Sequence, residues 1–316
     1  MADRKIIAVV GATGAQGGGL VRAALADPQG GFAVRALTRN PGSDKGRALA
    51  SAGAEVVAAD LDDVTSLERA FAGVHGAFCL TNFWEHFSVD KELAQAGNMA
   101  RAAKSAGVRH AIWSTLEDTR KWVPLESDRM PTLQGKYKVP HFDGKGEADE
   151  KFRQAGVPIT FLLTAFYWEN FIFFGSGPKP GADGELALTF PLGEAKLPGI
   201  AVEDIGKCAY AIFRRGEEFV GKTVGIAGEH LSGAEMAAAM SAALGRKIRY
   251  VDVPPEVFRN FGFPAADDIG NMFQFKRDFT DYYRGARSLE FTRSLNPELQ
   301  SFSAWLERNK GQIPLQ

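Results

Sequence analysis

Cysteine is scarce in this chain, and the sequence lacks the patterns of several common protein classes. The two cysteines among 316 residues, Cys79 and Cys208, fall in a predicted strand and a predicted helix, where isolated thiols are usually buried residues of a reducing compartment. None of the five histidines has the H-x-x-x-H or H-E-x-x-H spacing of a zinc site, and G-x-S-x-G does not occur. We therefore expect no metal centre and no serine hydrolase.

The chain also lacks an excess of charge and any long apolar run. Its 37 Lys and Arg residues balance 38 Asp and Glu residues, for a net charge of -1, so binding to nucleic-acid phosphates has no support. Apolar runs such as residues 159–167 fall well short of the ~20 residues that cross a bilayer. The first predicted strand leaves no room for a signal or transit peptide. We expect a cytoplasmic protein with no nucleic-acid partner and no membrane segment.

What the sequence does contain is an alternation of apolar and amphipathic segments. This rhythm is typical of a doubly wound parallel sheet with helices between its strands, and it predicts an α/β fold of the Rossmann type. The predicted strands are 5–10, 32–38, 54–58, 76–81, 109–114 and 158–164, and the predicted helices are 15–26, 64–72, 88–106 and 145–155.

The alternation breaks after Thr164, where an aromatic stretch runs into the Gly/Pro-rich segment 175–184. A predicted helix at 203–215 and a strand near 222–227 return to the main sheet, and a helix at 232–244, a strand at 247–253 and further helices follow. We therefore expect a dinucleotide-binding domain over 1–165, joined by 200–228. A smaller α/β lobe comprises residues 166–199 and 229–316.

The first strand runs directly into a glycine-rich turn. Residues 6–17 read IIAVVGATGAQG, and small residues at such a turn let a diphosphate approach the backbone closely. The helix that follows directs its unpaired N–H groups and its positive dipole end at the same place. The pattern predicts a dinucleotide site that contains Gly11, Thr13, Gly14, Ala15, Gln16 and Gly17.

The end of the second strand indicates which dinucleotide is bound. NAD-binding chains usually carry an acidic residue there, for the ribose hydroxyls, but this strand ends in Thr38-Arg39-Asn40. A guanidinium offers paired donors to a phosphate, and Lys45 adds a nearby cation. Arg39 and Lys45 therefore favour NADP(H), with a solvated loop arginine as the alternative.

Polar residues follow other strands at the edge where such sheets bind ligands. Asp60 and Leu61 follow the third strand, before Asp62 or Asp63 caps the next helix. Ser114 and Thr115 end the fifth strand, where a hydroxyl either orients a substrate or caps a turn.

The chain resembles a known family in several segments. VVGATGAQG, VRALTRNP and DLDD resemble atypical short-chain dehydrogenases/reductases. The segment HFDGKGE at 141–147, with FRQAGVPIT and ENF after it, is similar to the NmrA-like branch. The C-terminal segments FPAADD, SLNP and WLE are similar to its NADPH-sensor proteins.

The resemblance implies a preference for NADP(H) and members that act as redox sensors. It also implies cofactor contacts from Thr81, Asn82 and Phe83. Phe166 and the aromatic residues after it line the nicotinamide pocket or pack in the core.

The resemblance raises a catalytic question, because the superfamily's Tyr-x-x-x-Lys is incomplete here. Lys145 is present, but His141 stands where the tyrosine belongs, and Tyr137 lies a further turn upstream, before Pro140. Three interpretations stay open. In the first, Lys145 holds the cofactor ribose while His141 packs. In the second, Lys145 itself transfers a proton. In the third, His141, whose unperturbed pKa is near neutral pH, replaces the tyrosine.

Two functions follow from these interpretations. The first is a redox-sensing module in which NADP(H) occupancy changes the protein and a regulatory protein partner responds. The second is an NADPH-dependent reductase of quinones, enals or related small electrophiles that uses Lys145. The missing tyrosine favours the sensor, and the sequence leaves the oligomeric state open.

Overall fold

The computed structural model describes residues 4–181 and 183–315, which form two compact units. The first unit comprises residues 4–118, 141–164 and 203–224, and the second comprises residues 119–140, 165–202 and 225–315. Residues 119–140, which the expected first domain includes, group with the second unit.

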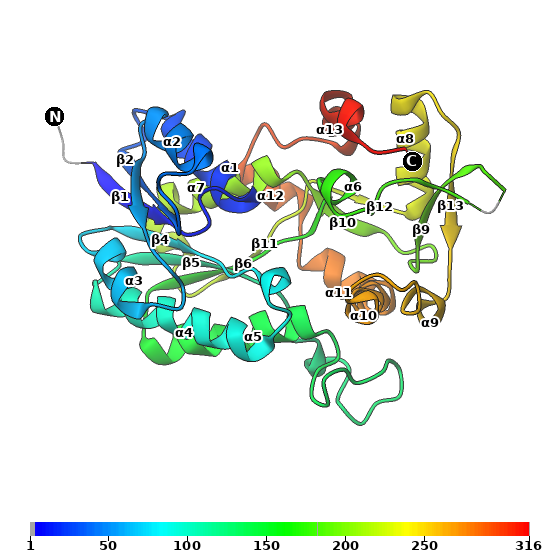
Figure 1. The fold of residues 1–316 in the computed structure, drawn as a ribbon, viewed down its shortest axis with the longest axis horizontal. Coiled ribbons are helices and arrows are strands. Elements are labelled where there is room, and N and C mark those ends of the chain that lie inside the picture. Colours follow the sequence, from blue (N-terminus) through cyan, green and yellow to red (C-terminus); the bar gives the residue numbers. More distant parts are fainter. Residues whose placement is uncertain (1–3, 182, 316) are drawn as a thin grey trace. The chain divides into compact units, whose positions relative to one another are not determined.

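The first unit contains a seven-stranded sheet with the order β11-β6-β5-β4-β1-β2-β3 (Figure 1). The pairs among β1 to β6 are all parallel. The chain starts in the middle, winds outward to β3 and then returns past β1, which is the Rossmann-type order predicted from the sequence. The strands are β1 (Lys5–Val9), β2 (Phe32–Thr38), β3 (Glu55–Ala58), β4 (Gly76–Cys79), β5 (His110–Thr115), β6 (Ile159–Leu163) and β11 (Thr223–Gly225).

Helices cover both faces of this sheet (Figure 1). One layer contains α3 (Val64–Phe71), α4 (Val89–Ser105) and α5 (Pro140–Ala155), whose apolar residues form a buried core with the strands. The other contains α1 (Ala15–Leu25), α2 (Asp44–Ser51) and α7 (Val202–Arg215). Both cysteines are buried, as predicted, and burial raises the pKa of the Cys79 thiol to about 12.

Local signals set most helix starts in this unit. The Asp63 carboxylate accepts hydrogen bonds from the N–H groups of Thr65 and Ser66 and so caps α3, as the sequence predicts. Ser88 caps α4 by accepting from the N–H of Lys91.

Two helix predictions need correction. Helix α2 was not predicted, because Gly46 is its one buried residue and no apolar periodicity marks it. Helix α5 begins at Pro140 and not at Lys145. Proline is well suited to the first helical position, where its missing N–H costs nothing. His141 therefore lies in the first turn of α5, and Tyr137 lies outside the helix.

The second unit contains two three-stranded sheets. In one, β10 (Leu197–Ile200) pairs parallel with β7 (Phe166–Tyr167) and antiparallel with β12 (Glu229–Leu231). In the other, β9 (Leu186–Phe190) pairs parallel with β13 (Ile248–Asp252) and antiparallel with β8 (Lys179–Pro180).

Helices and an aromatic core complete the second unit. Phe166, Phe171, Phe190 and Phe273 form a chain of ring contacts, with centroids 4.9 to 6.4 Å apart. Its helices are α6 (Asn170–Phe173), α8 (Gly233–Leu244), α9 (Pro255–Phe258), α10 (Ala266–Asp278), α11 (Thr280–Gly285), α12 (Leu289–Leu295) and α13 (Phe302–Asn309).

Candidate functional site

The glycine-rich turn joins β1 to α1 in the tight form that the sequence predicts. Gly11 has a positive φ of 65°, which glycine adopts without strain. A Cβ on Gly17 would lie 2.4 Å from the Gly11 carbonyl oxygen, so only glycine fits there. Gly14 precedes α1, and no side chain of the described residues caps this helix at Gly14. The start of α1 therefore has the close backbone and the free helix end that suit an anionic group.

The remaining predicted residues of this turn lie at its surface or beside it. Thr13 is half-buried and Ala15 is exposed. The Gln16 side chain accepts a hydrogen bond from the Ser114 hydroxyl, with the two oxygens 2.8 Å apart. Ser114, at the end of β5, is thus tied to the turn.

Arg39 follows β2 and is paired with a carboxylate that the sequence analysis did not single out. Its two terminal nitrogens each lie 3.2 Å from one oxygen of Glu85. Glu85 ends η1 (Phe83–Glu85), the short turn that follows β4, and Asn82 also donates to it at 3.3 Å. Lys45 lies on the first turn of α2 and is exposed.

The turn after β3 is held by its own polar groups. Asp60 accepts from the N–H of Asp62, and the Leu61 carbonyl accepts from the side chain of Asn98 at 2.7 Å. A hydrogen bond from Lys91 lowers the pKa of Asp62. This turn is anchored to α4 through Lys91 and Asn98.

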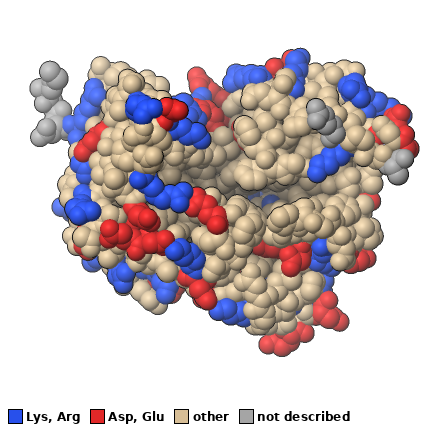
Figure 2. All heavy atoms as spheres, viewed as in Figure 1, with Lys and Arg blue, Asp and Glu red and all other residues tan. Residues whose placement is uncertain are grey.

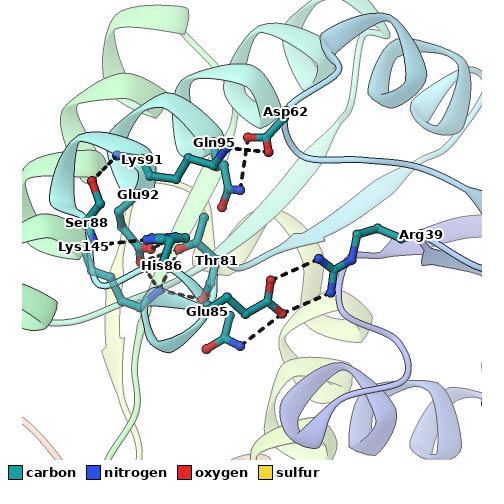
Figure 3. A network of polar contacts seen from close by, with 11 residues as sticks. Arg39, Asp62, Thr81, Glu85, His86, Ser88, Lys91, Glu92, Gln95 and Lys145 are labelled. Carbon is teal, nitrogen blue, oxygen red and sulfur yellow. Dashed lines mark hydrogen bonds and ion pairs between the residues drawn. The ribbon is translucent and has the colours of Figure 1, made fainter. Parts of the chain in front are cut away.

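Lys145 is the centre of a compact polar cluster at the end of β4 (Figure 3). Its ammonium nitrogen lies 3.0 Å from the Thr81 carbonyl oxygen, 2.8 Å from the Thr81 hydroxyl and 2.7 Å from Oε1 of Glu92. It also lies 5.1 Å from the ring centre of Trp113. An ammonium group has three protons, and these three oxygens match them.

Glu92 is fully buried beneath the lysine. Its Oε1 also accepts from the Thr81 hydroxyl at 2.5 Å. Its Oε2 lies 3.7 Å from Nε2 of His86. Because Nδ1 of His86 accepts from the N–H of Ser88, the neutral ring carries its proton on Nε2, facing the carboxylate. Glu92 therefore stands between the lysine and the histidine.

His141 is buried in an aromatic environment. Its ring centre lies 4.8 Å from Trp84, 4.8 Å from Phe142 and 6.1 Å from Phe83, and 5% of the residue is exposed. These contacts favour the interpretation that His141 packs at the helix start.

The other candidate site residues have structural partners. The Thr115 hydroxyl donates to Asp149 at 2.6 Å and so ties β5 to α5. Tyr137 belongs to the second unit and is 1% exposed, with Arg120 and Lys136 over its ring. Phe166 is also in the second unit, where its ring packs in the aromatic core.

Three site residues escaped the sequence analysis: Glu85, His86 and Glu92. Glu92 lies in the correctly predicted helix 88–106, and a carboxylate on its buried face is a signal that was available. Glu85 and His86 follow the strand end that was singled out for Thr81, Asn82 and Phe83.

The structure also bears on other ligands. Figure 2 shows basic and acidic residues interspersed on the visible face, without an extended area of one sign among the described residues. Within residues 4–181 and 183–315, no helix has the length and apolar character of a membrane span. In the same residues, no cluster of three or more His, Cys, Asp and Glu side chains is placed to hold a metal ion.

The chain is similar to known proteins along nearly its whole length. Residues 3–306 match the NmrA-like family. The NmrA-like family domain-containing oxidoreductase FrzB of Cladobotryum sp. is 32% identical over 293 residues, which cover 85% of this chain and 83% of that protein. The NmrA-like family domain-containing protein of Dictyostelium discoideum is 26% identical and covers 96% of this chain and 97% of its own.

A solved structure with the same fold is that of NmrA, a negative transcriptional regulator. It is 25% identical, covers 96% of this chain and 95% of its own, and superposes with a TM-score of 0.78. Further NmrA structures contain NAD (TM-score 0.75) and NADP (TM-score 0.73). Together with the Rossmann-type sheet and the glycine-rich turn, these matches show that the chain belongs to the NmrA-like family.

Proposed function

We propose that this protein binds NADP(H) and acts chiefly as a redox-sensing dinucleotide binder. The observation that carries this proposal is the Lys145 cluster, in which the ammonium is held by three oxygens, one of them from the buried Glu92 carboxylate. These contacts hold the ammonium in one position, which suits it to binding a ligand.

The residues of the first unit fit the dinucleotide. The turn from Gly11 to Gly17 and the start of α1 hold the diphosphate, because the backbone is accessible there and the helix end is positive. Asp60 and Leu61, at the end of β3, and Thr81, Asn82 and Phe83, at the end of β4, border the adenosine and nicotinamide halves. The ring of Phe166 packs in the aromatic core of the second unit, and a cofactor contact by this residue stays a prediction.

Arg39 and Lys45 select the phosphorylated cofactor. No acidic residue ends β2, and Arg39 presents two N–H groups side by side, a geometry that matches a 2′-phosphate. NmrA has been crystallised with both NAD and NADP, which supports a nicotinamide dinucleotide in this chain.

Lys145 holds the nicotinamide ribose in this proposal. Because three oxygens already accept from its ammonium, a ribose hydroxyl has to replace one of them. When bound, the nicotinamide supplies a hydride donor or acceptor. The protein's own contribution is to position the ribose.

The second candidate function is an NADPH-dependent reductase of quinones, enals or related small electrophiles. Relatives such as FrzB, which is named an NmrA-like oxidoreductase, favour it. In that case Lys145 stabilises developing negative charge on the substrate and Glu92 keeps the ammonium in place.

NADPH oxidation against a panel of quinones, enals and carbonyls separates these functions. We compare the wild type with Lys145→Ala and with Lys151→Ala, an exposed lysine on the same helix, as the matched control. Tight NADPH binding without turnover supports the sensor. Turnover that is lost in Lys145→Ala and kept in Lys151→Ala establishes the reductase.

A sensor must also distinguish ligand states, because only a difference in affinity between two conformations shifts their populations. We expect hydrogen exchange to show protection that extends beyond the glycine-rich turn when NADP(H) is added. Protection confined to residues 11–17, with no turnover, would contradict both functions and leave a passive nucleotide binder.

A further inference from the structure

Arg39, the proposed ligand of the 2′-phosphate, already has an anionic partner. Its Nη1 lies 3.2 Å from Oε2 of Glu85 and its Nη2 lies 3.2 Å from Oε1, so the two groups meet edge to edge (Figure 3). This fork-to-fork arrangement is the one that a guanidinium also uses for a phosphate. Glu85 therefore occupies the edge of Arg39 that a 2′-phosphate needs.

The pair is exposed and able to exchange. The Arg39 and Glu85 side chains are 70% and 48% exposed, and exposed ion pairs contribute little to the stability of a fold. A dianionic phosphate is a stronger acceptor than a single carboxylate, so it displaces Glu85 when the cofactor binds.

Glu85 stays near Arg39 after displacement, because its turn is anchored. Phe83, two residues earlier, is 3% exposed and contacts the rings of Trp84, His86 and His141. Asn82 donates to the Glu85 carboxylate at 3.3 Å. A displaced Glu85 carboxylate therefore remains close to the incoming phosphate, and like charges at short range repel.

We propose that Glu85 is an internal competitor of the 2′-phosphate and sets the preference between NADP(H) and NAD(H). This inference rests on the proposed function, since it requires a dinucleotide at Arg39. Competition at an exposed pair changes affinity by about two- to five-fold. Glu85 lowers the affinity for NADP(H) by that factor and leaves the affinity for NAD(H) unchanged, so it moderates the selectivity that Arg39 creates.

The test compares two probes that differ by the 2′-phosphate alone, 2′,5′-ADP and 5′-AMP, by isothermal titration calorimetry. The variants are Glu85→Gln, which removes the charge with little change of shape, and Arg39→Ala/Glu85→Gln. Glu218→Gln is the matched control. Glu218 also lies in a short 3-10 turn, η3 (Gly216–Phe219), is 45% exposed and pairs through both oxygens with Arg215.

We expect Glu85→Gln to bind 2′,5′-ADP about two- to five-fold more tightly than the wild type, with 5′-AMP unchanged and Glu218→Gln like the wild type. When Arg39 is already replaced by Ala, Glu85→Gln brings no tighter binding of 2′,5′-ADP, because the effect of Glu85 acts through Arg39. Unchanged or weaker binding of 2′,5′-ADP by Glu85→Gln overturns the inference. Weaker binding of 5′-AMP overturns it too, since Glu85 would then be a ribose ligand. If the wild type binds neither probe nor NADPH, the proposed function itself fails.

Discussion

Two ion pairs near the end of β4 differ in burial and, as a result, in what they can do. In the Lys145–Glu92 pair the side chains are 13% and 0% exposed, and in the Arg39–Glu85 pair they are 70% and 48% exposed. A buried charged group that loses its partner cannot hydrogen-bond to water instead, so Lys145 and Glu92 stay paired. Each member of the second pair has water as an alternative partner, so that pair can be exchanged for a ligand.

The difference assigns a role to each pair. The fixed pair maintains the shape and charge of the site, and the exchangeable pair responds to what binds. Thr81 strengthens the contrast, because its hydroxyl and carbonyl both accept from Lys145 while its hydroxyl donates to Glu92.

Glu92→Ala is expected to have the largest effect on stability. It leaves the Lys145 ammonium buried without its carboxylate, which costs about 3–5 kcal/mol in the free energy of unfolding. Glu85→Ala, the matched change in the exposed pair, is expected to cost less than about 1 kcal/mol. Urea unfolding followed by circular dichroism measures both. Equal losses in the two variants would contradict the contrast between the pairs.

A second buried polar contact, away from the site, tests whether burial itself produces large effects. Nε2 of His110 lies 2.8 Å from the Thr160 hydroxyl, which donates to the Phe219 carbonyl, so Nε2 carries the proton. Burial, with a smaller contribution from His75, lowers the pKa of His110 to about 4. The folded state therefore stays neutral where the unfolded chain takes up a proton.

The sign of the pH effect follows from linkage. The stability that neutral His110 contributes is fully present above pH ~6.5 and is lost as the pH falls toward 4, a loss of about 3 kcal/mol at most. His110→Gln keeps an N–H donor but does not titrate. We expect the unfolding free energy of the wild type to fall more steeply over this pH range than that of His110→Gln. Parallel pH profiles would rule out the histidine as the cause.

Much of the fold could be predicted from the sequence. The sheet and most helices were predicted because their signals are local: apolar strands, the turn from Gly11 to Gly17 and the Asp63 cap. Helix α2 was missed because it buries little, and α5 begins at Pro140, before the predicted start at Lys145, because proline fits the first helical position. Both errors concern residues whose helical role depends on position more than on residue type.

The site was predicted less completely, for a different reason. Lys145 and Arg39 follow from motif spacing, but their partners do not. Glu92 meets Lys145 only because α4 and α5 lie in one layer, and Glu85 meets Arg39 only because the turns after β4 and β2 approach each other. Such pairings are products of the tertiary fold, and no spacing in the sequence records them.

Arg39→Ala is expected to change binding without changing stability. Hydrogen bonds to charged groups contribute about 1.5–3 kcal/mol, so NADPH should bind about ten- to a hundred-fold more weakly, while NADH binding changes little. The unfolding free energy should remain within about 0.5 kcal/mol of the wild type, since the residue is exposed. Titration with both cofactors measures the split. Equal losses for NADPH and NADH would remove Arg39 from the 2′-phosphate site.

His141→Phe should have the smallest effect on binding, although the residue is as buried as the fixed pair. Its ring lies among Phe83, Trp84 and Phe142, and phenylalanine keeps an aromatic ring of similar size there. We expect the NADPH affinity to stay within about two-fold of the wild type.

The same variant, tested for NADPH oxidation with the electrophile panel, decides the open catalytic question. Turnover lost with cofactor affinity intact would make His141 the replacement for the missing tyrosine. Unchanged turnover would confine His141 to packing, where it maintains the shape of the site and takes no part in the chemistry.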